Sequence, residues 1–149
     1  MIQLQRNYNT YYNNSLNDGE LSPPYTRTYE EYVALARIPH HDGVPARVIN
    51  ALHLRVGRTE LSIEQIASDL NLTKRTLQRR LQSQNTNFAQ LRDDLRFHYA
   101  IKYLIDDNLS VDLVSRALDF SDRTSFTNAF KRWTGLSPST FRKLFRDFA

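Results

Sequence analysis

The sequence contains no cysteine, few glycines and prolines, and no long apolar run. Without cysteine, the chain can form no disulfide, thiolate zinc site, iron–sulfur cluster or cysteine nucleophile. Only 4 glycines and 5 prolines among 149 residues disfavour an all-β fold with many tight turns. No apolar stretch approaches the roughly 20 residues that span a bilayer, and the first residues are too polar for a secretory signal. We therefore expect a soluble, cytoplasmic, mainly helical protein.

The charges are unevenly distributed along the chain. The formal net charge is +4, but residues 1–44 contain three basic and five acidic residues and carry a net charge of −2. Residues 45–149 contain 17 basic and 11 acidic residues and carry +6. A basic C-terminal part indicates a polyanionic partner or a basic solvated surface, and the placement of the charges must decide between them.

Residues 1–44 form a candidate N-terminal arm. They hold six of the eight tyrosines, and Pro23 and Pro24 force extended backbone in their middle. A short helix is predicted over residues 28–37, with Thr28 as its cap and Glu31 three residues later. The tyrosines would suit a platform for single-stranded nucleic acid, but basic residues are few. We expect a docking segment or a partly ordered linker.

Helical periodicity begins at Pro45. Apolar residues recur every three or four positions up to residue 57. Ser62 and Gln65 match a capping box at the start of a second helix, and Asn71 suits the left-handed residue that ends it. A third helix follows at once, and its buried positions are Leu77 and Leu81. This order predicts a helix, a tight turn and a second helix.

The same pattern occurs twice. The segment SIEQIASDLNL, which starts at residue 62, returns 48 residues later as SVDLVSRALDF. Ala67 and Ser115 are small residues four positions before the turn, where two crossing helices touch closely. The turn residues Asn71 and Asp119 are the non-glycine types that best tolerate positive φ. The two matches in register predict two helix-turn-helix units.

A long helix is predicted between the units, over residues 87–106. Twenty residues at 1.5 Å each give a length of about 30 Å. Two apolar stripes would let this helix pack against both units at once; they contain Phe88, Leu91 and Leu95, and Phe97, Ile101, Leu104 and Ile105. A last helix is predicted from Ser137 and Pro138, after a terminating Gly135.

The second helix of the first unit has one strongly basic side. Residues 73–84 contain four basic residues and no acidic one, whereas a solvated helix face usually mixes both signs. Arginine and glutamine form paired hydrogen bonds with guanine and adenine edges. We therefore favour DNA as the partner of the side opposite Leu77 and Leu81. That side carries Arg75, Gln78 and Arg79, flanked by Lys74 and Arg80.

The equivalent helix of the second unit is more neutral. When Phe126 and Phe130 are buried, its outward side presents Arg123, Thr124, Asn128, Lys131 and Arg132. Asparagine pairs with adenine and a threonine methyl contacts thymine, so base reading and a plain polar surface both stay open here. Lys131 and Arg132 are better placed for phosphates.

Residues 45–146 resemble the DNA-binding domain of the AraC/XylS family of bacterial transcription regulators. The resemblance is carried by LTKRTLQRRL, by LRFHYAIKYL and above all by ALDFSDRTSFTNAFKRWTGLSPSTFR. In the last segment the matching residues are Phe120, Phe126, Phe130, Lys131, Gly135, Pro138 and Arg142.

The resemblance implies seven helices in two helix-turn-helix subdomains joined by a long helix. It implies recognition helices at 74–84 and 123–133 that enter successive major grooves of double-stranded DNA at a promoter or operator. Carried over by position, the base-contacting residues are Arg75, Gln78, Arg79, Arg123, Thr124 and Asn128. The basic residues beside them are expected to contact phosphates: Lys74, Arg80, Lys131 and Arg132.

Two positions depart from the family pattern. Asp119 stands where glycine is usual, which is expected to strain the second turn slightly, and Asn128 stands where a basic residue is frequent. Similar members carry a large N-terminal effector-binding domain, which 44 residues cannot replace. We therefore expect either a truncated piece or a short stand-alone member without an effector domain.

We predict an all-α fold with an N-terminal arm (1–44), a first helix-turn-helix subdomain (45–86), a linker helix (87–106) and a second subdomain (107–149). The predicted function is sequence-specific binding of double-stranded DNA and regulation of transcription, in the cytoplasm at the nucleoid. RNA polymerase is a further candidate partner. We expect no catalytic residue, metal, cofactor or membrane contact.

Three alternatives belong to other functional classes. One is a nonspecific architectural DNA-binding protein, and another is an interaction module that docks a protein partner through the arm. The third is an enzyme built on His40, His41 and Asp42. It is the least favoured, because adjacent histidines point in different directions and no third ligand has a useful spacing.

Overall fold

The computed structural model describes residues 27–148, and every regular element in this range is a helix. The predicted features before residue 27, including the Pro23-Pro24 break, lie outside the described residues. The α-helices are α2 (Tyr29–Leu35), α3 (Gly43–Arg55), α4 (Ile63–Asp69), α5 (Lys74–Gln82), α6 (Phe88–Ile101), α7 (Val111–Ala117), α8 (Arg123–Thr134) and α9 (Pro138–Phe145). A π-helix, η2 (Lys102–Asp106), continues α6, and a 3-10 turn, η3 (Arg146–Phe148), follows α9.

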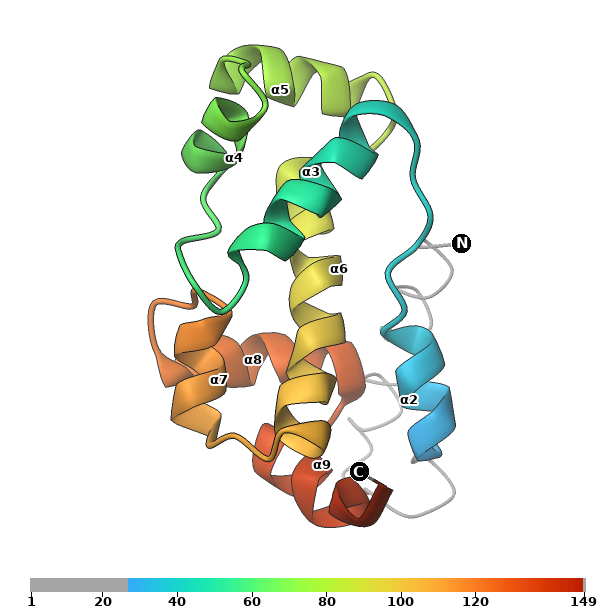
Figure 1. The fold of residues 1–149 in the computed structure, drawn as a ribbon. Coiled ribbons are helices and arrows are strands. Elements are labelled where there is room, and N and C mark those ends of the chain that lie inside the picture. The colour runs from blue at the N-terminus through green and yellow to red at the C-terminus, as the bar shows by residue number, and fades with distance from the viewer. Residues whose placement is uncertain (1–26, 149) are drawn as a thin grey trace.

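The helices gather into two groups toward the two ends of α6 (Figure 1). In the first group α3 packs against α4 and α5, and in the second α8 packs against α7 and α9. Helix α6 contacts both α3 and α8, and its two predicted apolar stripes are buried along its length. The all-α prediction is confirmed for the described residues. Seven α-helices, α3 to α9, occupy the part of the chain that resembles the AraC/XylS family.

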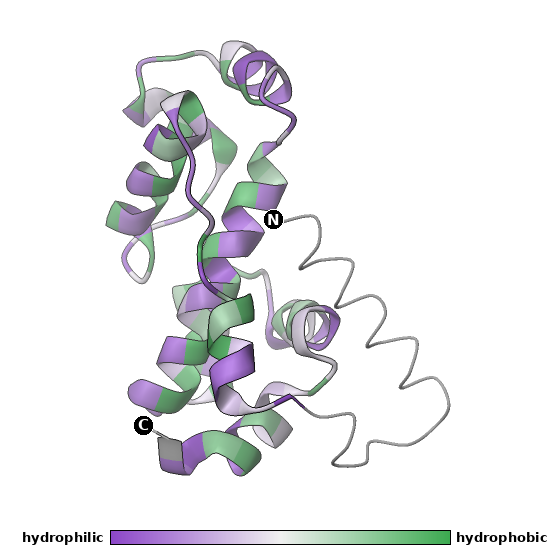
Figure 2. Cartoon of the chain, turned by 90° about the vertical axis from the view of Figure 1, so that its right-hand side faces the viewer, coloured by the Kyte–Doolittle hydropathy of each residue, from purple (hydrophilic) through white to green (hydrophobic). Residues whose placement is uncertain are grey.

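Local capping explains where the helices begin. The side chains of Ser62, Thr73 and Ser110 each accept a hydrogen bond from the backbone N–H three residues later, at the starts of α4, α5 and α7. The capping box predicted at Ser62 is formed only by half, because the Gln65 carboxamide oxygen accepts from Arg55 instead. Hydrophilic and hydrophobic residues alternate along the helices (Figure 2). This is the pattern of amphipathic helices that pack around a core.

The two tight turns adopt the predicted conformation. Asn71 has φ 57° and Asp119 has φ 59°, the left-handed region. Ala67 and Ser115, the small residues before the turns, are both 2% exposed. Both units therefore have the same helix–turn–helix geometry, as their repeated sequence predicts.

The two groups of helices also touch each other directly. The Asp119 carboxylate accepts a hydrogen bond of 2.8 Å from the backbone N–H of Leu61, in the loop between α3 and α4. The backbone N–H of Gly57 donates to the carbonyl of Ala117 at 2.9 Å. Asp119 was expected only to strain its turn, but its side chain makes a contact that a glycine could not make.

A buried arginine of α6 holds the same turn from the other side. Arg96 is 6% exposed and donates to the carbonyls of Leu118 (2.7 Å) and Asp119 (2.5 Å). Its guanidinium lies 4.0 Å from the centre of the Phe120 ring. Since Leu118, Asp119 and Phe120 form the turn between α7 and α8, Arg96 fixes the second unit on the linker helix.

The described part of the arm belongs to the core of the second group. Thr28 and Glu31 form the predicted capping box at the start of α2. Tyr32 is fully buried. It donates through its hydroxyl to the carbonyl of Thr134 at 3.2 Å, and its ring meets Phe141 and Phe145 of α9 edge-on. Helix α2 therefore docks within its own chain. Helix α3 begins at Gly43, two residues before the predicted boundary.

The first prediction tests the docking of α2. Tyr32→Ala should lower the free energy of unfolding by about 3–5 kcal/mol, because it leaves a cavity among aromatic rings. Val33→Ala is the matched control, since Val33 is 42% exposed on the same helix and should change stability by less than about 0.5 kcal/mol. Urea unfolding measures both. Equal, small effects of the two changes would show that α2 contributes little to the core.

The second prediction tests the buried arginine. Arg96→Lys should lower the free energy of unfolding by about 1.5–3 kcal/mol, the usual value of a hydrogen bond to a charged group. A lysine cannot donate to two carbonyls and stack on a ring at once. The exposed Arg37→Lys serves as the control in the same urea titration. If Arg96→Lys unfolds with the same free energy as the wild type, the paired hydrogen bonds of Arg96 to the two carbonyls are not needed for stability.

Candidate nucleic-acid interface

Helix α5 presents a basic side to solvent. Leu77 and Leu81 are fully buried and therefore fix the rotation of the helix about its axis. All five predicted residues of this helix are exposed, with Lys74 and Arg80 flanking the side opposite the leucines: Lys74, Arg75, Gln78, Arg79 and Arg80. The helix ends at Gln82 and Ser83 is its C-cap, so it is slightly shorter than the predicted range 74–84.

The central residues of this side are free to bind a ligand. The side chains of Arg75, Gln78 and Arg79 form no hydrogen bond or ion pair with any residue between 27 and 148. An arginine presents five N–H donors in a fixed planar fork, and a glutamine presents both a donor and an acceptor. Hydrogen-bonding groups that point together from one turn of helix can contact the edges of adjacent bases.

Helix α8 is built in the same way but is less basic. Phe126, Phe130 and Trp133 form its buried side, and Gly135 ends it with φ 80°. The predicted residues on the outward side are all exposed: Arg123, Thr124, Asn128, Lys131 and Arg132. The helix spans 123–134 and so confirms the predicted position within one residue.

The caps of the two helices differ in charge. Thr73 caps α5 with a neutral hydroxyl, whereas Asp122 caps α8 with a carboxylate. The hydrogen bond from the Ser125 backbone N–H lowers the pKa of Asp122, so this carboxylate is ionised at neutral pH. A phosphate that approaches the start of α8 meets a negative charge on the cap residue, whereas the cap residue of α5 is neutral.

Two acidic residues touch the interface and were missed by the sequence analysis. Glu64 Oε2 lies 3.0 Å from Lys74 Nζ, and Asp112 Oδ1 lies 3.6 Å from Arg123 Nη1. The hydrogen bond from Lys74 lowers the pKa of the Glu64 carboxyl. The sequence did hold a signal for these pairs, because the internal repeat aligns Glu64 with Asp112.

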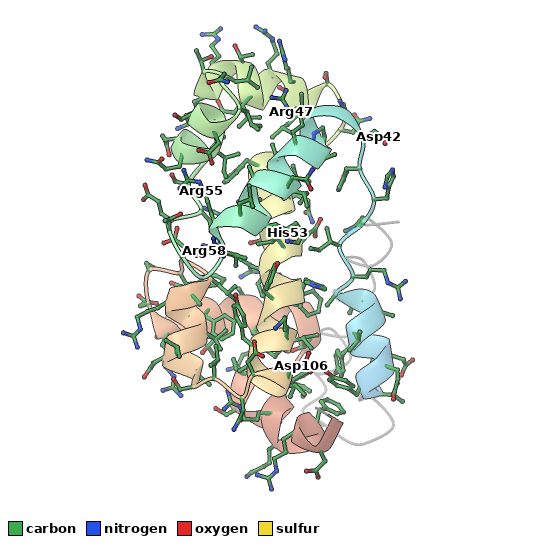
Figure 3. All side chains as sticks on the ribbon, viewed as in Figure 1. Asp42, Arg47, His53, Arg55, Arg58 and Asp106 are labelled. Atoms are coloured by element: carbon green, nitrogen blue, oxygen red, sulfur yellow. The ribbon has the colours of Figure 1, made fainter. Side chains whose placement is uncertain are left out.

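His40 and His53 lie at opposite ends of α3 and do not share a site. His40 Nε2 contacts Asp42 Oδ1 at 3.1 Å on an exposed connection, whereas His53 lies near the other end of α3 and contacts the Tyr99 hydroxyl at 2.8 Å (Figure 3). No group of three or more His, Cys, Asp or Glu residues in the range 27–148 is arranged to hold a metal ion. Within residues 27–148, no helix is both long enough and apolar enough to cross a bilayer.

Comparison with known proteins identifies the architecture. A family model described as a helix-turn-helix domain matches residues 66–144, which is more than half of the chain. The chain belongs to the AraC-type helix-turn-helix family. The matched range includes the last part of α4, all of α5 to α8 and most of α9, and therefore both candidate recognition helices.

The relatives of this AraC-type chain carry the names of transcription regulators. It is 35% identical over 109 residues to the ornithine utilization regulator of Pseudomonas aeruginosa, covering 73% of this chain and 32% of the relative. It is 29% identical over 86 residues to the virulence regulon transcriptional activator VirF of Shigella flexneri, covering 58% and 33%. The chain thus spans about a third of the length of these relatives.

Solved structures show the same fold. The transcriptional regulator CdpR of Pseudomonas aeruginosa superposes with a TM-score of 0.61 at 35% identity, over 68% of this chain and 32% of CdpR. A DNA-binding transcriptional dual regulator of Escherichia coli K-12 superposes with a TM-score of 0.63 at 19% identity, over 71% and 95% of the two chains. The second likeness is one of fold alone.

Proposed function

We propose that this chain binds double-stranded DNA at specific sites and thereby regulates transcription. One observation carries the proposal: two equivalent helices, α5 and α8, each pair a buried apolar side with a side of exposed polar and basic residues. The helix-turn-helix arrangement places such a helix in the major groove. The names of the relatives support the same function.

Five exposed side chains of α5 have roles in DNA binding. Arg75 and Arg79 donate to the O6 and N7 atoms of guanine, and Gln78 pairs with adenine. Lys74 and Arg80 lie beside this group and contact phosphates, which fix the position of the helix without reading sequence.

Helix α8 makes the weaker set of contacts. Arg123, Thr124 and Asn128 face the bases, and Lys131 and Arg132 contact phosphates. The acidic cap Asp122 reduces the attraction of this helix for the DNA backbone, and an asparagine offers one base pairing where α5 offers two arginines. The half-site under α5 is therefore the better defined one.

The linker sets the distance between the two helices. Helix α6 and η2 contain 14 and 5 residues, which gives a rod of roughly 30 Å, close to one turn of B-DNA at about 34 Å. One chain can then place α5 and α8 in successive major grooves. Because the two faces differ, the target is an asymmetric site and not a palindrome.

RNA polymerase is the second partner that we propose, because a regulator of transcription must act on its initiation. Such a protein works at the nucleoid in the bacterial cytoplasm and needs no catalytic step of its own. The chain matches about a third of each relative, so the proposal concerns the DNA-binding part and assigns no effector to it.

Selection of bound sites from a random duplex library is the direct test of the function. Sequence-specific binding predicts an enriched asymmetric site that random DNA cannot displace. An architectural protein would enrich no sequence. The other alternative, a partner docked through the arm, would have to use a surface of α2 other than the one that Tyr32 buries against Thr134 and α9.

The third prediction concerns Arg79. Arg79→Ala should reduce the affinity for the selected site by about 1–3 kcal/mol and relax the preference at one base pair. The change should leave folding within about 0.5 kcal/mol, because the side chain is exposed. Fluorescence anisotropy with selected and random duplexes measures the effect, and Arg37→Ala is the control. An equal loss on both duplexes would make Arg79 a phosphate contact.

The fourth prediction concerns the phase of the two half-sites. Inserting about five base pairs between the halves moves them to opposite faces of the duplex. Since α6 and the contacts at Asp119 hold the units together, specific affinity should fall to that of the α5 half alone. Inserting about ten base pairs returns the two half-sites to the same face of the duplex but leaves them one turn farther apart. This insertion should therefore not rescue binding. Full affinity after the five-pair insertion would mean that only one unit engages DNA.

A further inference from the structure

The same acid–cation pair occurs in both helix-turn-helix units. Glu64 and Asp112 are each the second residue of the first helix of a unit, α4 or α7. Lys74 and Arg123 are each the first residue of the second helix, α5 or α8. The distances are 3.0 Å and 3.6 Å. Two pairs at equivalent positions indicate a feature of the unit and not a chance surface contact.

Stability does not explain these pairs. All four side chains are more than half exposed, between 52% and 62%, and ion pairs of this kind contribute little to folding. A cation at the start of a helix is also unfavourable, because the N-terminus already carries partial positive charge. The acids compensate this, but the position of Lys74 and Arg123 needs a functional reason.

The start of a recognition helix is where the DNA backbone comes closest. A phosphate binds favourably at a helix N-terminus, and a lysine or arginine there would strengthen that attraction for any sequence. With a carboxylate within 4 Å of the cation, the pair has no net charge, so it attracts an approaching phosphate more weakly than the lone cation would. The acids therefore weaken the attraction that does not depend on sequence.

We propose that Glu64 and Asp112 determine specificity by neutralising Lys74 and Arg123 until the helices are seated in the correct grooves. Nonspecific affinity comes almost entirely from phosphates, and specificity is a ratio of two affinities that rises when the nonspecific one falls. At the correct site, the seated helix brings a DNA acceptor, a phosphate for Lys74 and a base edge for Arg123, close enough to share the cation with the acid. The proposal rests on the DNA-binding function proposed above.

The variants that test this are Glu64→Gln, Asp112→Asn and the double variant, with Glu30→Gln as the matched control. Glu30 is an exposed acid of α2, so its loss changes the net charge equally without touching α5 or α8. Binding to a selected and to a random duplex is measured by fluorescence anisotropy over a series of salt concentrations. Thermal unfolding, followed by circular dichroism, checks that the four variants fold like the wild type.

Each neutralised acid should raise the affinity for random DNA about three- to five-fold at 0.15 M salt and steepen the slope of log K against log salt by up to about 0.9. Affinity for the selected site should rise less, so the ratio of the two affinities falls. In the double variant the two fold-changes should multiply, to roughly nine- to twenty-five-fold, and the two changes of slope should add. Variants that match Glu30→Gln in affinity, slope and ratio would refute the role of the acids.

A second arm tests whether the acid acts through the cation. In a Lys74→Gln background, Glu64→Gln should have less than half of its effect on random DNA. An undiminished effect would mean direct repulsion of phosphates and would overturn the pairing. The two proposals fail differently: a wild-type chain that prefers no selected duplex refutes the function, whereas a specific wild type with unresponsive acids refutes only this inference.

Discussion

The structure depends on a charged group in its interior. Arg96 extends from the linker helix to the carbonyls of Leu118 and Asp119 and lies on the ring of Phe120. Burial lowers its pKa to about 10, so the guanidinium is still charged at neutral pH. Burying a charge is costly unless it is paired and hydrogen-bonded; the turn supplies two carbonyl acceptors, and the Asp93 carboxylate lies 4.0 Å from Nη1. Because that turn leads directly into α8, Arg96 contributes to the placement of the second recognition helix on the linker helix, together with the stacking of Phe97 on Trp133.

The first unit is attached to the same turn through Asp119. Its carboxylate accepts from Leu61, and Ala117 accepts from Gly57, while Arg92 of α6 donates to the carbonyl of Leu61 at 3.2 Å. The loop after α3, the linker helix and the second turn thus form one hydrogen-bonded junction, and α5 and α8 are expected to move as one body. Any bend in the complex must then come mostly from the DNA, at a few kcal/mol.

The sequence predicted the elements that depend on local patterns. Caps and periodicity located α3 to α9, and the positions of Leu77 and Phe126 fixed which sides of α5 and α8 face solvent. Contacts between distant residues left no such pattern. Arg96 resembles any surface arginine of a helix, and nothing near Tyr32 in the sequence indicates Thr134. The ion pairs of Glu64 and Asp112 are an intermediate case. No local pattern indicates them, but a comparison of the two repeats would have found them.

A rigid junction also explains how two unequal helices can serve one site. In the complex that we propose, α5 is seated through Arg75 and Arg79 and α8 is then already held near the adjacent groove, so its binding is intramolecular and occurs at a high effective concentration. Contacts that are too weak alone, such as those proposed for Thr124 and Asn128, would then suffice. An α8 as basic as α5 would bind DNA in any register and compete with correct seating. The neutral face of α8 and its acidic cap Asp122 are therefore consistent with a helix that reads DNA only after α5 has placed it.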